Sequence, residues 1–195
     1  MTYIIMEHFT KWMGKGEKHS EVPPEIIEKF KGIFLIGEDS YDIVVSIWEN
    51  HGLSSYKNGL FSIVNPIDYQ DIIRKFPNAS NSAIVFAKSC VGGLFVFERL
   101  NIGDSILYYN VHYGNRKVIS TSFEIFFEWE IGADNFWKEE CYGKIELKVN
   151  QKLDAPAYDE CYAFFPALAL GGNENISNME KVKVIEHLNF LAQLY

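Results

Sequence analysis

The N-terminal part of the chain alternates between stretches with the hydrophobic spacing of a helix and short polar breaks. Residues 2–13 place apolar side chains, among them Phe9 and Trp12, at helical spacing, which predicts an amphipathic helix. The same spacing predicts three more helices, over residues 22–32, 41–52 and 65–76. Their expected boundary residues are two terminal glycines, Gly32 and Gly52, and two N-caps, Ser40 and Asn65.

Two shorter segments interrupt this helical pattern. Residues 14–21 are polar and include two glycines, so they predict a flexible connection. Asn58-Gly59 lies between two short apolar segments and predicts a tight turn. The N-terminal part is therefore predicted to be mainly helical.

From Ser82 onward the hydrophobic period changes from that of a helix to that of strands. The segments concerned are rich in β-branched and aromatic residues and cover residues 82–88, 92–100, 105–114 and 117–120. Turn-forming residues, such as Gly92-Gly93, separate them. This pattern predicts a meander of three or four antiparallel strands.

The C-terminal part returns to helical spacing. Residues 120–132 predict a helix in which Thr121 and Glu124 have the spacing of a capping box. Four apolar residues lie on one face of this helix and are expected to pack on the sheet: Phe123, Phe126, Phe127 and Ile131. Residues 135–149 continue as a further helix, and residues 179–195 end in a helix that docks through Leu188, Leu191 and Leu194. The predicted fold class is α+β, with helices packed around an antiparallel meander sheet.

Composition narrows the class of protein. The chain has 195 residues, 48% of them hydrophobic and 15% aromatic, which is enough to fill a core. A net charge of −8 argues against direct nucleic-acid binding, because phosphate recognition needs clustered Lys and Arg. No apolar run approaches the roughly 20 residues of a membrane span, and residues 1–12 lack the pattern of a secretory signal. Three widely spaced cysteines agree with a cytoplasmic location and free thiols.

The search for catalytic chemistry centres on the segment 159–172, DECYAFFPALALGG. Cys161 is a candidate nucleophile, but neighbouring carboxylates raise a thiol pKa, which favours a buried structural cysteine. Asp159 and Glu160 are either an acid/base pair or solvent-facing residues, and His112 is either a general base or a hydrogen-bonded histidine on a sheet face. Zinc-ligand spacings, a P-loop and a G-x-S-x-G motif are missing from the sequence. We therefore assign no catalytic residue, metal or cofactor.

Negative charge gathers between Glu124 and Glu140, where six acidic residues and one lysine give a net charge of −5. Two tryptophans lie in the same stretch. It is either a solvated face that maintains solubility or a docking surface for a basic protein partner. The partner-binding hypothesis comprises Glu124, Glu128, Trp129, Glu130, Asp134, Trp137, Glu139 and Glu140.

Two segments carry a resemblance to known families. Residues 160–172, followed by residues 180–194, resemble the C-terminal domain of a bacterial type VI secretion immunity family. Residues 47–69 resemble the GAD-like domain that commonly precedes it. The resemblance implies a non-enzymatic protein that binds and neutralises a cognate toxin, typically a nuclease. It also implies that Pro166, Gly171 and Gly172 define the fold, as part of the inner wall of the C-terminal lobe.

We therefore expect a GAD-like part over residues 1–80 and a sheet with an immunity-type domain over residues 81–195, packed as one compact unit. The expected function is stoichiometric inhibition of a secreted antibacterial toxin. Two alternatives stay open: a small enzyme or ligand-binding module with a pocket between the two halves, and an interaction domain of an unrelated stress or regulatory system. A polar pocket joining His112 to carboxylates would favour the enzyme, and an acidic face would favour immunity.

Overall fold

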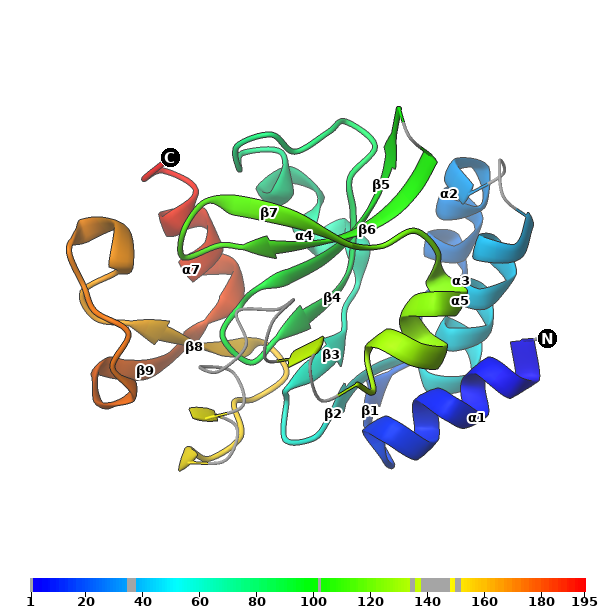
Figure 1. Ribbon diagram of the computed structural model, residues 1–195, viewed down its shortest axis with the longest axis horizontal. Helices are drawn as coiled ribbons and strands as arrows, with labels where there is room; N and C mark the ends of the chain where they lie inside the picture. Colours follow the sequence, from blue (N-terminus) through cyan, green and yellow to red (C-terminus); the bar gives the residue numbers. More distant parts are fainter. Residues whose placement is uncertain (1, 35–37, 102, 134–135, 138–147, 150–151) are drawn as a thin grey trace.

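The computed structural model describes residues 2–34, 38–101, 103–133, 136–137, 148–149 and 152–195 (Figure 1). Its N-terminal elements are, in order, α1 (Thr2–Met13), β1 (Glu17–Ser20), α2 (Pro24–Phe34), α3 (Glu38–His51), β2 (Leu53–Tyr56), β3 (Phe61–Ile63) and α4 (Pro66–Ile73). Four strands follow: β4 (Ile84–Ser89), β5 (Leu94–Leu100), β6 (Gly103–Asn110) and β7 (Asn115–Ser120). The remaining elements are α5 (Phe123–Ile125), the π-helical η1 (Phe126–Glu130), β8 (Glu160–Phe164), the 3₁₀ turns η3 (Leu168–Leu170) and η4 (Ile176–Asn178), β9 (Met179–Lys183) and α7 (Val184–Leu191).

The central sheet has seven antiparallel strands in sequential order from β1 to β7, and β8 and β9 form a separate two-stranded sheet. The predicted meander is confirmed, with β4 to β7 close to the expected segments. The prediction of a mainly helical N-terminal part is wrong, because β1, β2 and β3 extend the sheet there. The supposedly flexible segment 14–21 contains β1, whose side chains are all exposed and which pairs with β2 through Lys18 and Ser54.

Most helix boundaries follow the expected physical signals. Asn65 caps α4, since its side-chain oxygen accepts a hydrogen bond of 3.0 Å from the Ile67 amide. The capping residue before α5 is Ser122 rather than Thr121, and its hydroxyl accepts from the Ile125 amide at 3.1 Å. α2 runs through the expected stop at Gly32, and α3 begins two residues before Ser40.

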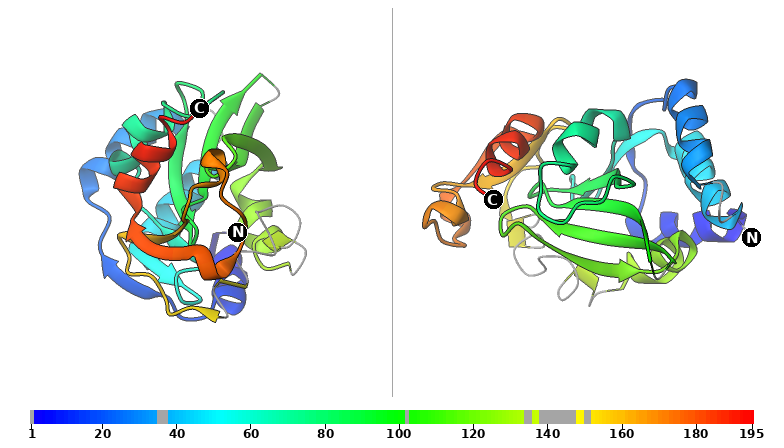
Figure 2. Two further views of the ribbon diagram at one scale, coloured as in Figure 1. Left: turned by 90° about the vertical axis from the view of Figure 1, so that its left-hand side faces the viewer. Right: turned by 90° about the horizontal axis from the view of Figure 1, so that it is seen from above.

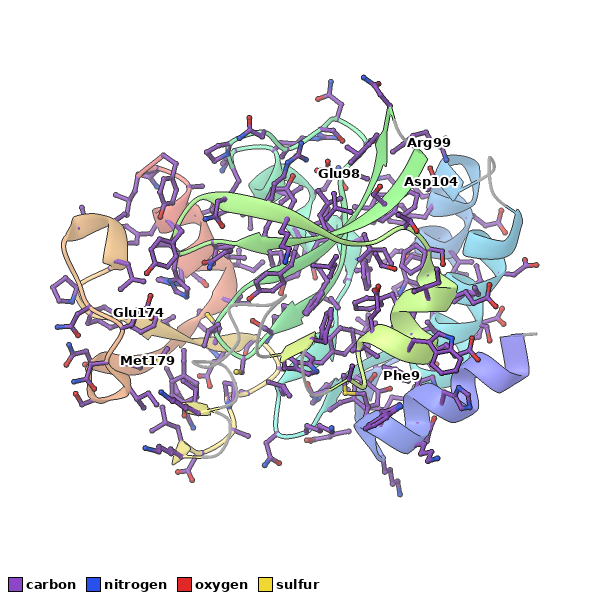
Figure 3. The ribbon with its side chains drawn as sticks, viewed as in Figure 1. Phe9, Glu98, Arg99, Asp104, Glu174 and Met179 are labelled. Atoms are coloured by element: carbon purple, nitrogen blue, oxygen red, sulfur yellow. The ribbon has the colours of Figure 1, made fainter. Side chains whose placement is uncertain are left out.

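Each face of the seven-stranded sheet carries its own hydrophobic core. On one face α1, α2, α3, α5 and η1 enclose an aromatic cluster in which Phe9, Phe61, Phe95 and Phe126 are all 0% exposed. On the other face α4 and α7 pack over a cluster that includes Leu94, Leu188 and Leu191 (Figure 2). Phe9 is labelled on α1 in Figure 3. Burying one such side chain contributes about 1.5–3 kcal/mol, so both helical layers are firmly attached.

Charged groups on β5, β6 and β7 fix the cross-strand register (Figure 3). Glu98 is fully buried, accepts a hydrogen bond of 2.5 Å from the Tyr109 hydroxyl and forms an ion pair with Arg116. Arg99 and Asp104 form a second pair, with 2.9 Å between Nε and Oδ1. The buried carboxylate of Glu98 is tolerated because Tyr109 and Arg116 both bind it directly.

The C-terminal part is joined to the sheet by specific polar contacts. Lys88 on β4 is 1% exposed, and its Nζ donates to the Glu160 carbonyl at 2.8 Å. The Tyr162 amide donates to the Cys90 carbonyl at 2.8 Å. Burial lowers the pKa of Lys88. The expected division near residue 80 stays a prediction.

The segment 159–172 divides into a buried strand and an exposed loop. Cys161 and Ala163 on β8 are 0% exposed, which confirms the inner-wall prediction for the strand. Phe165 and Leu170 are 46% and 59% exposed, so the prediction is wrong for the loop that follows. A Cβ at Gly172 would lie 1.9 Å from the Pro166 carbonyl oxygen, which explains why glycine is required there.

None of the described helices is both long enough and apolar enough to cross a membrane.

Candidate functional site

The helical run of α5 and η1 presents one apolar face to the sheet and another face to solvent. Phe123, Phe126 and Phe127 are at most 1% exposed, as expected from their spacing. On the outer side Trp129 is 64% exposed and Ile125 is 42% exposed. An indole that exposed is unusual in a chain that buries most of its aromatic side chains.

The N-terminal helix α1 lies against η1 and enlarges this surface. Trp12 is 45% exposed, although the helical spacing placed it on the apolar face together with Phe9. Its ring covers Gly132, where a Cβ would lie 2.2 Å from Trp12 Cγ. Gly132 therefore provides the space in which the α1 indole meets the end of η1.

His8 connects the two elements. Its ring centroid is 6.0 Å from that of Trp129 in an edge-on arrangement, and its Nδ1 is 3.4 Å from Glu128 Oε1. We define the tryptophan face as His8, Trp12, Ile125, Glu128 and Trp129. Glu124 and Glu130, both partly exposed, belong to the same helical run.

The acidic hypothesis also includes Asp134, Trp137, Glu139 and Glu140. Trp137 is 4% exposed and its Nε1 donates to the Ile131 carbonyl at 2.9 Å, so its side chain packs in the core. Asp134, Glu139 and Glu140 lie outside the described residues. Sequence reasoning missed His8 and Trp12, because only the fold brings α1 beside η1.

The candidate catalytic residues are held in structural roles. Burial raises the pKa of the Cys161 thiol to about 12, which removes the thiolate that a nucleophile needs. Lys183 Nζ lies 2.7 Å from Asp159 Oδ2 and 3.5 Å from Glu160 Oε1. The hydrogen bond from Lys183 lowers the pKa of Asp159. Both carboxylates therefore form surface ion pairs with one cation.

His112 is a buried histidine on the strand-to-turn segment after β6. It is 2% exposed, and its Nε2 lies 2.8 Å from the Val91 carbonyl oxygen. Burial lowers its pKa to about 4, so the ring is neutral at physiological pH. Within the described ranges, no group of three or more His, Cys, Asp or Glu residues is arranged to hold a metal ion.

A polar cleft of about 570 Å³ lies where β1 and the β2–β3 turn meet the segment 155–158. Its polar side chains are those of Lys15, Glu17, His19, Lys57, Asn58 and Tyr158, among others. His112, Asp159 and Glu160 do not line it. The cleft is thus a pocket between the two halves of the chain, but it does not join His112 to carboxylates.

A comparison with solved structures finds the same fold elsewhere. The crystal structure of Atu4351 from Agrobacterium tumefaciens superposes with a TM-score of 0.75 at 18% sequence identity. The match covers 96% of this chain and 88% of that chain. At this level of identity the similarity establishes the fold alone. No curated protein matches the sequence significantly.

Two family models match the chain in succession. The model of the GAD-like domain matches residues 4–108, and the model of "T6SS immunity protein Tdi1, C-terminal" matches residues 120–195. Both resemblances expected from the sequence are thereby confirmed. The chain therefore belongs to the type VI secretion system (T6SS) immunity proteins, with a GAD-like domain followed by a Tdi1 C-terminal domain.

Proposed function

We propose that this chain protects the toxin-producing cell by binding a cognate T6SS toxin stoichiometrically in the cytoplasm, through the tryptophan face. The observation that carries the proposal is the 64% exposure of Trp129 beside Glu128 and His8. Exposed tryptophan flanked by charged residues is a common composition of binding hot spots. A face that served only solubility would place polar side chains at this position.

The energetics support a strong contact at this face. Truncating a hot-spot tryptophan typically weakens binding by about 2 kcal/mol or more, which is about thirty-fold in Kd. Trp12, which is 45% exposed and packs on Gly132 just after η1, supplies a second large apolar side chain. Glu124 and Glu128 add negative charge, which accelerates association with a basic partner.

The charge of the chain favours a nuclease as the toxin. A nuclease must bind phosphate groups, so its substrate groove carries clustered Lys and Arg. An immunity protein with a net charge of −8 is attracted to such a groove. If Glu124 and Glu128 bind in that groove, they exclude the nucleic acid, and inhibition requires no chemical step.

The test uses a catalytically inactive variant of the toxin encoded beside the gene of this chain. Isothermal titration should give a 1:1 complex, and Trp129→Ala should raise Kd at least about thirty-fold. Ile67→Ala is the matched control, because Ile67 is 41% exposed on α4, which lies on the other face of the sheet. Equal affinities of Trp129→Ala and the wild type would remove the tryptophan face from the interface.

The polar cleft supports a second candidate function, the binding of a small ligand between the two halves. Its volume of about 570 Å³ falls in the range of ligand pockets, about 300–1,000 Å³. His19 packs against Tyr158 with ring centroids 4.5 Å apart, so two aromatic rings form part of the cleft wall. A thermal-shift screen with small anions, repeated on Lys57→Ala, tests this candidate, and an unchanged melting temperature with every anion argues against it.

A further inference from the structure

The Tdi1 C-terminal domain carries a second surface, distinct from the tryptophan face. A groove of about 450 Å³ lies between α7 and the loop that follows β8. Phe165, Leu170 and Phe190 line it and are 46%, 59% and 43% exposed. α7 lies at the opposite side of the molecule from α1 in Figure 1, and Figure 3 likewise places Met179 far from Phe9.

The loop that presents Phe165 and Leu170 is held by backbone hydrogen bonds. The Phe165 amide donates to the Asn178 carbonyl at 2.8 Å, and the Gly172 amide donates to the Ala167 carbonyl at 3.1 Å. The close approach of Gly172 to the Pro166 carbonyl leaves no room for a side chain. The two apolar side chains are therefore held outward by an ordered loop, and little ordering is required when a partner binds.

The other wall is α7, which is anchored from behind. Leu188 and Leu191 are 0% exposed and face the core, which turns Phe190 toward the groove. A contiguous apolar surface of this kind marks an interaction site.

Charge at the groove selects among possible occupants. Lys183 is neutralised by Asp159 and Glu160, and burial keeps His187 neutral at physiological pH. Among the described residues Glu186 has no ion-pair partner, so its carboxylate is an uncompensated negative charge on the rim. The complementary occupant is an apolar segment with a basic residue beside it.

We propose that this groove docks an apolar segment of the cognate toxin, with a basic residue of that segment paired to Glu186. The proposal rests on the proposed function. A second copy of this chain fits less well, because each copy carries a net charge of −8 and a two-fold contact would bring two Glu186 carboxylates together. A toxin bound at the tryptophan face raises the effective concentration of its own segment at the groove.

The experiment titrates Leu170→Asp, Phe190→Ser and Glu186→Lys with the inactive toxin used above. Leu170→Asp and Phe190→Ser should each raise Kd about 10- to 100-fold while stoichiometry stays at 1:1, because a tethered second contact is lost but the first remains. Glu186→Lys should weaken binding, and more at low than at high salt. Ile67→Asp, which also places a carboxylate at an exposed apolar position, should leave Kd unchanged.

The outcomes separate the two proposals. Unchanged Kd for both apolar variants, with weakened binding by Trp129→Ala, overturns the groove proposal and leaves the proposed function standing. Absence of any complex with the wild type overturns both. Light scattering provides a further outcome: the wild type is a dimer, Leu170→Asp is a monomer, and both bind the toxin with equal affinity. That result would assign the groove to a second copy of this chain and would also overturn the proposal. Melting temperatures should stay within about 2 °C of the wild type, since the substituted side chains are exposed.

Discussion

Acidification should destabilise this protein through two neighbouring buried histidines. The rings of His112 and His187 lie 5.8 Å apart where α7 packs against the turn after β6, and they are 2% and 8% exposed. Burial lowers both pKa values to about 4, and for His187 the neighbouring His112 adds to the effect. The folded state therefore holds both rings neutral at a pH where the unfolded chain protonates them.

The sign and size of the effect follow from linkage. Between about pH 6.5, the ordinary value, and about pH 4, the unfolded chain binds more protons, so stability falls as pH is lowered through this window. With one pKa unit worth about 1.4 kcal/mol, each histidine should remove about 2 kcal/mol between pH 7.5 and pH 5. The loss should be complete near pH 4, below which both states are protonated.

The assay is urea unfolding at pH 7.5 and pH 5 for the wild type and His187→Leu. Carboxylates contribute to the pH dependence of both proteins, so the informative quantity is the difference between their losses. His187→Leu should lose about 2 kcal/mol less than the wild type on acidification. His19→Asn, which replaces an exposed histidine on β1, is the control. Equal losses in wild type and His187→Leu would refute the reasoning from buried neutral histidines.

Three further expectations concern two buried core residues and the carboxylates Glu124 and Glu128 on α5 and η1. Leu191→Ala should lower stability by about 2–5 kcal/mol in thermal unfolding, because Leu191 is 0% exposed, and an unchanged melting curve would contradict its burial. Cys161→Ser should lower stability but leave toxin affinity nearly unchanged, and loss of activity in a folded variant would restore the nucleophile hypothesis. Glu124→Lys with Glu128→Lys should slow association and weaken its salt dependence in stopped-flow kinetics, while an on-rate equal to the wild type would favour the solubility explanation.

The sequence predicted a strand correctly where the segment has its own pattern of apolar residues, and missed it where that pattern is lacking. The strands β4, β5 and β6 are rich in apolar residues, and turn residues separate them from one another and from β7, so the meander was predictable. β1 is EKHS, with every side chain exposed, and it is a strand only because β2 offers hydrogen-bonding groups at its edge. No local pattern in residues 17–20 could have revealed that pairing.

The candidate site was predictable only in part, for a similar reason. The outward position of Glu124, Glu128 and Trp129 follows from the helical period of the phenylalanines around them. The spacing of Trp12 and Trp137 did not reveal their environments: Trp12 packs on Gly132 with 45% of its surface exposed, and Trp137 is buried with its indole bonded to the Ile131 carbonyl. An indole suits either environment, so its position depends on tertiary contacts that the sequence does not specify.

The most direct test of the account is a titration of toxin activity by this chain. A fixed concentration of active toxin, well above Kd, is incubated with increasing amounts of the wild type, and residual activity is measured. Stoichiometric binding predicts a linear fall to an end point at one equivalent, and Trp129→Ala should shift that curve to higher concentrations. Full inactivation by a small fraction of an equivalent, or no inactivation at any ratio, would contradict the proposal that the chain neutralises its toxin by binding.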